Sequence, residues 1–146
     1  MNINHLHNKI AAVANINGVS IGNETDKATW QVSYAEQPTP EQVAQVQTII
    51  DAYSDESAQA EMEAPFVVAC EQFRNVCGQI ATAMNVAKFK GGFDEMIEFQ
   101  SSQVSATADG MRLALAWSAA NELCKYEGGK IGLGQPAWWY RCWELA

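Results

Sequence analysis

The sequence predicts an α+β protein: a small N-terminal antiparallel β-meander plus a helix, followed by a C-terminal three-helix bundle with an aromatic-rich tail. Three observations support this fold. Short apolar runs separated by turn-forming residues occupy positions 10–34, as in a small sheet. From position 40, apolar residues recur every three or four positions, as along one face of a helix. The same spacing returns after Pro65 and ends in a segment crowded with tryptophan.

The 146 residues are predicted to divide at Pro65 into an acidic module of residues 1–64 and a helical module of residues 65–146. The first module has two basic and nine acidic side chains, a net charge of −7. The second has seven basic and eight acidic side chains, a net charge of −1. All four cysteines and four of the five tryptophans lie in the second module. We therefore expect two parts of different chemical character.

The predicted meander has three short strands, at residues 10–16, 19–21 and 28–34. Asn17-Gly18 separates the first two, and this dipeptide favours a tight hairpin turn because both residues tolerate a positive φ. In the third strand, Trp30 and Tyr34 alternate with polar residues, which indicates one buried face. A sheet this small is not stable alone, so another element is expected to cover Trp30 and Tyr34.

A helix start follows the strands. Thr39 is a good N-cap, Pro40 suits the first helical position, and Gln42 completes a capping box. We predict a helix over residues 40–53, whose apolar stripe comprises Val43, Val46, Ile50 and Tyr53. Residues 55–64 are charged and small, and the pattern fits either an exposed helix or a linker.

Three more helices are predicted after Pro65. The first has apolar residues alternating in spacing between four and three: Phe66, Cys70, Phe73, Cys77, Ile80 and Met84. The second follows a break at Gly91-Gly92 and carries Phe93, Met96, Ile97, Gln100 and Val104. The third begins at a Ser105 or Thr107 cap and ends at Gly128-Gly129. Along it lie Met111, Ala114, Leu115, Ala119, Glu122 and Leu123, with Trp117 to one side.

The C-terminal segment, residues 130–146, is apolar on both sides whether it forms a strand or a helix begun by Pro136. It contains Trp138, Trp139, Tyr140 and Trp143. Each such ring can bury roughly 150–250 Å², so the segment is expected to close the core of the bundle or to contact another chain. Trp, Tyr and Arg dominate binding hot spots. We therefore predict these four residues, with Trp30 and Tyr34 on the sheet, as core-or-interface anchors for a partner.

Charge and hydropathy exclude two classes of partner. The net charge of −8 argues against nucleic-acid binding, which needs clustered Lys and Arg. No run approaches the roughly 18 apolar residues that span a bilayer, and residues 1–9 do not resemble a secretion signal. We expect neither nucleic-acid nor membrane partners, and a chain that is soluble and in the cytoplasm at synthesis.

No catalytic, cofactor or metal site is predicted. The four cysteines form no CxxC pair and are expected to be buried, reduced thiols, although Cys124 and Cys142 could meet in three dimensions. Zinc is disfavoured because no ligand pair has the usual spacing. His5 and His7 could chelate a metal from a strand, but solvated side chains are the expectation at this terminus. The acidic pairs lie on predicted solvated faces, so we expect no enzyme.

Residues 7–53 resemble a small module found in tailed-phage and prophage tail regions, in proteins encoded near tail-fibre or tail-assembly genes. The resemblance is carried by KIAAV at 9–13, GVSIG at 18–22, DKATW at 26–30 and the helix at 39–51. It covers about a third of the chain, and its motifs are a turn, a strand tryptophan and a helix cap. The resemblance therefore implies a biological context rather than a chemistry.

Taken with the absence of a catalytic pattern, the resemblance predicts a non-enzymatic, tail-associated structural protein of the virion that docks onto a fibre or baseplate protein and forms a possible homo-oligomer. Two alternatives remain open. One is a tail-fibre assembly chaperone that is absent from the finished particle. The other is an inhibitor of a host defence complex, in which the acidic first module mimics nucleic acid. A thiol-dependent enzyme is the least expected class.

Overall fold

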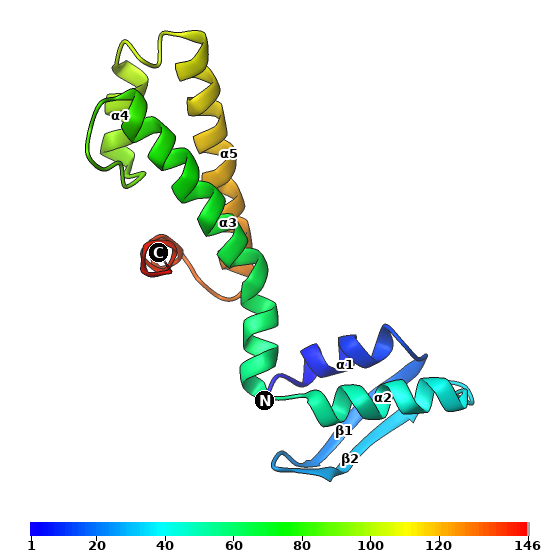
Figure 1. Ribbon diagram of the computed structural model, residues 1–146. Coiled ribbons are helices and arrows are strands. Elements are labelled where there is room, and N and C mark those ends of the chain that lie inside the picture. The colour runs from blue at the N-terminus through cyan, green and yellow to red at the C-terminus, as the bar shows by residue number, and fades with distance from the viewer. Residues whose placement is uncertain (146) are drawn as a thin grey trace. The chain divides into compact units, whose positions relative to one another are not determined.

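The structure of the protein is a computed structural model that describes residues 1–145, and it confirms the α+β class (Figure 1). In chain order, the described residues form the following elements: α1 (Ile3–Ala11), β1 (Ile16–Asn23), β2 (Asp26–Tyr34), α2 (Pro40–Ala52), α3 (Asp55–Ala83), α4 (Phe93–Ser101), α5 (Ala108–Lys130) and α6 (Ala137–Glu144). The chain forms two compact units, unit 1 (Met1–Met62) and unit 2 (Glu63–Ala146). The boundary between them falls inside α3.

Unit 1 corrects the predicted meander. Its described sheet has two antiparallel strands, β1 and β2, rather than three. The predicted first strand, residues 10–16, instead contains the end of helix α1 at Ile10 and Ala11, then a turn, and reaches β1 only at Ile16. Leu6 and Ile10 lie four residues apart on α1, and both are fully buried. Asn2 caps this helix by accepting a hydrogen bond from the backbone N–H of His5 at 3.0 Å. The apolar run after Lys9 therefore ends a helix instead of forming a strand.

The hairpin turn also lies elsewhere than predicted. Asn17-Gly18 sits inside β1, where the pairing with β2 slips between Ile16 and Gly18, as an extra residue in one strand produces at a bulge. The reversal instead follows Asn23, whose side-chain oxygen accepts hydrogen bonds from the backbone N–H and the hydroxyl of Thr25, both at 3.0 Å. Asn and Gly tolerate the backbone angles of bulges as well as those of turns, so Asn17-Gly18 was wrongly predicted to form the hairpin turn.

The core of unit 1 forms where α1, α2 and the start of α3 meet one face of the hairpin. Trp30 is buried in β2 and contacts the ring of Tyr53 edge-on, with centroids 5.8 Å apart. Tyr34 packs half-buried on the same core, so the predicted alternation of β2 is confirmed. The capping box of Thr39 and Gln42 is also present at the start of α2. The buried members are Leu6, Ile10, Ala14, Trp30, Val46, Ile50, Tyr53 and Ala58.

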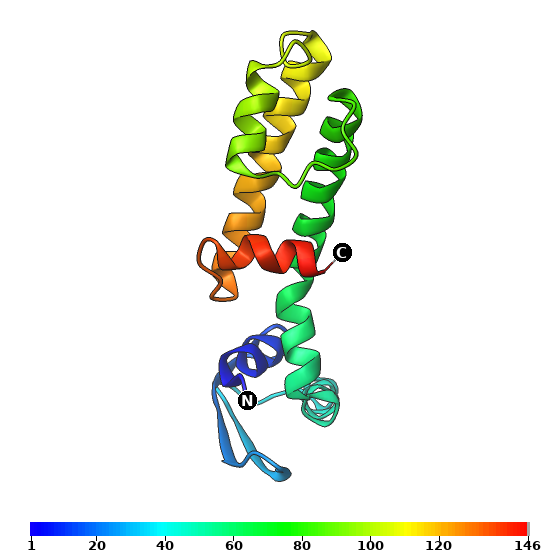
Figure 2. The same cartoon turned by 90° about the vertical axis from the view of Figure 1, so that its left-hand side faces the viewer.

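Unit 2 contains the three predicted helices together with a fourth. Residues 55–64, left open between helix and linker, are helical, and Pro65 lies inside α3. Figure 2 shows α3, α4 and α5 side by side, with α6 crossing α3 and α5 below α4. The N-cap of α5 is Thr107, which accepts a hydrogen bond from Gly110 N–H at 3.0 Å. The helix continues through Gly128 and Gly129, where it was predicted to end, to Lys130.

The C-terminal segment, for which the sequence allowed either a strand or a helix, forms helix α6. It completes a core rich in aromatic rings and sulfur, in which the buried members are Phe66, Ala69, Cys70, Phe73, Cys77, Ile80, Ala81, Phe89, Met96, Phe99, Leu113, Ala120, Cys124, Trp138 and Cys142. The apolar stripe predicted for α3 is buried from Phe66 to Ile80. On α5, by contrast, Leu113, Ala120 and Cys124 face the core, whereas Met111 and Leu115 are exposed.

Candidate functional site

The predicted anchors are distributed between the core and the surface. Trp138 is only 1% exposed and belongs to the core of unit 2. Trp139 and Trp143 are partly buried against that core, whereas Tyr140 is 64% exposed. Trp30 and Tyr34 line the core of unit 1. Of the six residues, Tyr140 offers the most surface, and a partner-binding role for the set remains a prediction.

Phe73 of α3 is the point at which the tail closes the core. Its ring lies 6.5 Å from that of Trp138, 6.0 Å from that of Trp143 and 5.9 Å from that of Trp117, measured between centroids. Tilted and edge-on pairs of this kind stabilise a core beyond the area that they bury. Helix α6 is therefore part of the bundle.

The surface of unit 2 carries many large apolar side chains. Four of them form what we call the α4–α5 face: Phe93 and Ile97 on α4, and Met111 and Leu115 on α5. Their exposed fractions are 73%, 48%, 55% and 74%, respectively. Each pair is spaced by four residues, so both members of a pair point to the same side of their helix. These residues are a candidate docking surface.

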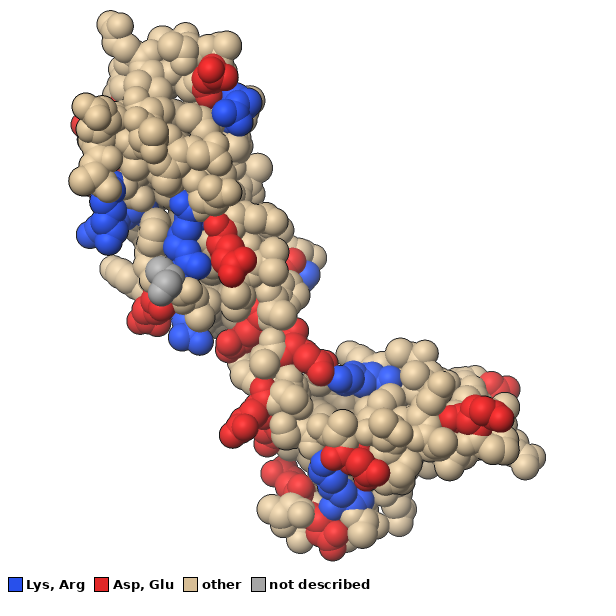
Figure 3. All heavy atoms as spheres, in the orientation of Figure 1, with Lys and Arg blue, Asp and Glu red and all other residues tan. Residues whose placement is uncertain are grey.

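A hollow of about 340 Å³ joins the two helices of this face. It is lined by Gln100 and Ser105 together with Met111, Ala114 and Leu115. Gln100 follows Ile97 by three residues and therefore lies on the same side of α4. On the side drawn in Figure 3, charged atoms are sparse over the end of unit 2 that carries α4 and the start of α5. The α4–α5 face is thus apolar and shallowly indented.

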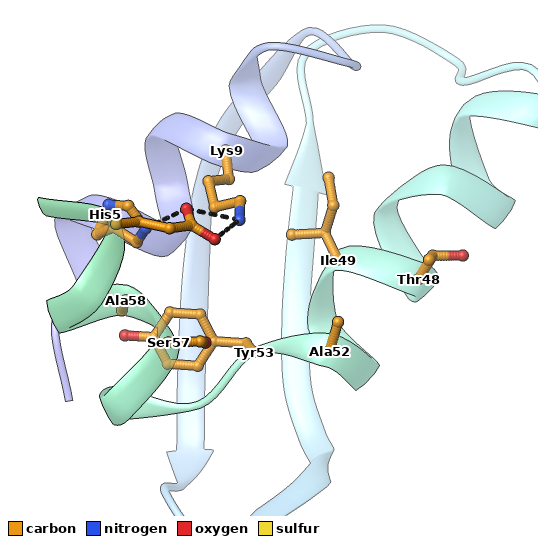
Figure 4. A pocket seen from close by; sticks show the side chains of 9 residues that line it. His5, Lys9, Thr48, Ile49, Ala52, Tyr53, Ser57 and Ala58 are labelled. Atoms are coloured by element: carbon orange, nitrogen blue, oxygen red, sulfur yellow. Dashed lines mark hydrogen bonds and ion pairs between the residues drawn. The ribbon is translucent and has the colours of Figure 1, made fainter. Parts of the chain in front are cut away.

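Unit 1 has a cavity of about 210 Å³ between α1, α2 and the start of α3 (Figure 4). At its edge, the Glu61 carboxylate accepts hydrogen bonds from Lys9 Nζ at 2.7 and 2.8 Å. His5 Nε2 lies 3.2 Å from the same carboxylate. The hydrogen bonds from Lys9 lower the pKa of Glu61 below its ordinary value. Because Lys9 contacts both carboxylate oxygens and His5 contacts one of them, the cluster links α1 to α3.

The structure also changes the geometry expected of the two histidines. His5 and His7 lie on α1 rather than on a strand. Residues two apart on a helix point to different sides, so the pair cannot chelate one ion in the way a strand would allow. His5 instead contacts Glu61, as described above.

Three buried thiols meet in the core of unit 2. Cys70 of α3, Cys124 of α5 and Cys142 of α6 are each 0% exposed, and their sulfur atoms all lie within 4.8 Å of one another. The possible approach of Cys124 to Cys142 is therefore observed, with Cys70 as an unexpected third member. Cys77, two helical turns from Cys70, is buried outside the group. Sequence spacing could not reveal this cluster because each thiol comes from a different helix.

The three thiols form one hydrogen-bonded system. Hydrogen bonds from Cys124 and Cys70, together with the nearby charge of Arg74, lower the pKa of Cys142. The same contacts with Cys142 and Cys70, together with burial, raise the pKa of Cys124. Arg74 is held in place because its Nη1 donates to the backbone carbonyl of Cys142 at 2.7 Å. The Cys142 thiol also donates to the backbone carbonyl of Cys70, with Sγ and O 3.6 Å apart, which ties α6 to α3.

No protein-family model, curated protein or solved structure matches the chain. Among the described residues, no helix is both long enough and apolar enough to cross a membrane.

Proposed function

We propose that this chain is a non-enzymatic, tail-associated structural protein of a tailed phage, and that it docks onto a fibre or baseplate protein through the α4–α5 face of unit 2. The observation that carries the proposal is the exposure of Phe93, Ile97, Met111 and Leu115 on two adjacent helices. The likeness of residues 7–53 to phage tail modules supplies the context.

Exposure of this kind favours a binding role on physical grounds. Single exposed apolar residues are ordinary on a protein surface, but a contiguous patch exposed to water marks an interaction site. Phe93 and Leu115 each leave about three quarters of their surface in solvent, and burying a side chain of that size stabilises by roughly 1.5–3 kcal/mol. A partner helix laid across α4 and α5 would recover this energy, and its own apolar residues would enter the hollow beside Gln100.

The proposal is tested in particles produced with the full-length chain. Mass spectrometry of purified virions should detect the wild-type protein in a constant ratio to the tail proteins. The variant Leu115→Glu places a charge at the hollow of the α4–α5 face. We expect it to accumulate as a folded, soluble protein and to be at least tenfold depleted from particles, because burying an unpaired carboxylate is costly.

Val43→Glu is the matched control. Val43 lies on α2 of unit 1 and is 44% exposed, so the same change adds the same charge away from the α4–α5 face. This variant should enter particles at the wild-type level. Absence of the wild-type protein from virions would contradict the proposal and favour an assembly chaperone, and so would normal incorporation of Leu115→Glu.

A further inference from the structure

We propose that Cys70, Cys124 and Cys142 form a three-coordinate thiolate site for a soft metal ion, Cu(I), that ties α3, α5 and α6 together. The inference is independent of the docking surface, because it concerns the interior of unit 2. It starts from a geometric fact: three sulfur atoms from three different helices converge within 4.8 Å of one another in the core.

The separation of the sulfurs suits a single bound ion. With metal–sulfur bonds of about 2.3 Å, three sulfurs arranged around one ion lie roughly 4 Å apart. The sulfurs therefore need to approach one another by less than about 1 Å relative to the upper limit of 4.8 Å. Small side-chain rotations can supply this movement, because all three residues project from regular helices.

The number of ligands indicates which ion fits. No fourth His, Cys, Asp or Glu of the described chain joins the group, and the complete burial of all three residues leaves little access for a water ligand. Structural zinc sites are almost always four-coordinate, so three buried sulfurs match Zn²⁺ poorly. Thiolate ligands select Cu(I) among the soft ions, and three sulfurs complete a trigonal environment for it.

The surroundings also suit a charged complex. Cu(I) bound to three thiolates carries a net charge of −2, and burial makes such a charge costly unless it is compensated. The guanidinium of Arg74, fixed by its 2.7 Å hydrogen bond to the Cys142 carbonyl oxygen, offsets part of this charge. Binding releases the protons of the thiols that ionise, so copper should bind more tightly as the pH rises.

The test uses the full chain, purified in a phosphine reductant without oxygen and stripped of metal by a chelator. Copper is supplied as the Cu(I)–bathocuproine disulfonate complex, whose colour fades as copper passes to the protein. Because the thiols are buried, the titration is carried out both on the folded protein and during refolding from urea. We expect one Cu(I) per chain and an X-ray absorption spectrum with three sulfur neighbours and no nitrogen or oxygen neighbour.

Four alanine variants locate the site. Cys70→Ala, Cys124→Ala and Cys142→Ala should each weaken Cu(I) binding by more than the roughly 10–100-fold that loss of an outer-shell partner costs. Cys77→Ala is the matched control, because Cys77 is also buried, at 1% exposure, on the same helix as Cys70. This variant should bind copper as the wild-type protein does. Circular dichroism of the metal-free proteins shows whether each variant folds.

Several results would overturn the assignment. Failure of the wild-type protein to take up copper even during refolding would do so, as would an equal loss of binding in Cys77→Ala. Displacement of Cu(I) by an equimolar amount of Zn²⁺ would contradict three-coordination. Should the three cluster variants fail to fold, the X-ray absorption spectrum of the wild-type protein still decides, because a site with fewer than three sulfurs rules out the proposal.

Discussion

The two units place their large apolar side chains differently. Among the described residues, eleven such side chains are exposed, and only Ile3 and Val43 of these belong to unit 1. The other nine lie in unit 2, whose core is also the larger and holds the thiols, Trp138 and Phe73. Unit 2 therefore has apolar residues left over after its own core is complete, whereas unit 1 has few.

This difference separates two uses of an apolar residue. Inside unit 2, rings and sulfurs hold the helices together, and on the α4–α5 face the same residue types remain in water. Unit 1 instead surrounds a modest core with charges, and the ion pair of Lys9 and Glu61 joins its helices at the surface. We therefore expect mutations in unit 2 to affect either stability or binding according to burial, and surface mutations in unit 1 to have small effects on stability alone.

The largest effect should come from Phe73→Ala in unit 2. Phe73 is 0% exposed and contacts three tryptophan rings, so its truncation should lower the free energy of unfolding by about 3–5 kcal/mol. Urea denaturation followed by tryptophan fluorescence measures this loss, because four of the five tryptophans lie in unit 2.

Phe93→Ala supplies the comparison within the same unit. Phe93 is 73% exposed, so the same chemical change should alter stability by less than about 0.5 kcal/mol while reducing incorporation into particles. Equal losses of stability from the two substitutions would show that the α4–α5 face is structural, and the contrast between core and surface would fail.

The next effect concerns two neighbouring glycines at the end of α5. A Cβ atom on Gly128 would lie 2.8 Å from Trp138 Cβ and 3.3 Å from Phe66 Cε2, so Gly128→Ala should destabilise unit 2 by about 1–3 kcal/mol. A Cβ on Gly129 meets nothing within 4 Å. Gly129→Ala should therefore stabilise the helix by up to about 1 kcal/mol. Thermal unfolding of the two variants should give shifts of opposite sign, and a shared sign would contradict the close packing of α6 on α5.

These residues show how far the sequence predicts the fold. The capping box at Thr39 and Gln42 acts within one turn of helix, so its pattern identified the start of α2 correctly. The position of the β-turn depends on how β1 and β2 pair, and Asn17-Gly18 satisfies a bulge as well as it would satisfy a turn. Helix α1 was missed because its apolar residues Leu6 and Ile10 run directly into a segment that resembles a strand.

The candidate sites were predicted less completely, for a related reason. Helix α5 is apolar around much of its circumference, so periodicity could not show that Leu113 and Cys124 face the core while Met111 and Leu115 face solvent. Whether an apolar face of a helix is buried depends on which other elements pack against it, and the local sequence pattern carries no information about those elements. The thiol cluster depends on contacts over 54 and 72 residues of chain, between Cys70 and its partners on α5 and α6.

A smaller effect is expected at the start of α2 in unit 1. The Thr39 hydroxyl accepts a hydrogen bond from Gln42 N–H at 3.2 Å, so Thr39→Ala should cost unit 1 about 1 kcal/mol. Thr48→Ala is the control, since Thr48 is an exposed threonine in the middle of the same helix. It should leave stability unchanged or slightly raised, because alanine is the better helix former. Hydrogen exchange of α2 peptides measures both, and faster exchange in Thr48→Ala than in Thr39→Ala would refute the role of the cap.

The smallest expected effect is electrostatic and concerns the ion pair of Glu61 and Lys9 on the surface of unit 1. Glu61 is about half exposed, so its pairing with Lys9 is screened by water, and Glu61→Gln should cost no more than about 1 kcal/mol at neutral pH. Because the pKa of Glu61 is lower in the folded protein than in the unfolded chain, this stabilisation is present above the unfolded pKa of about 4.3 and is lost as the pH falls through the folded pKa.

Wild type and Glu61→Gln should therefore differ in hydrogen exchange of α1 at pH 7 and converge in acid. Glu71→Gln, at an exposed position later on α3, should not alter exchange of α1 at either pH. A difference between wild type and Glu61→Gln that persisted in acid would mean that packing around the side chain, rather than its charge, joins α1 to α3.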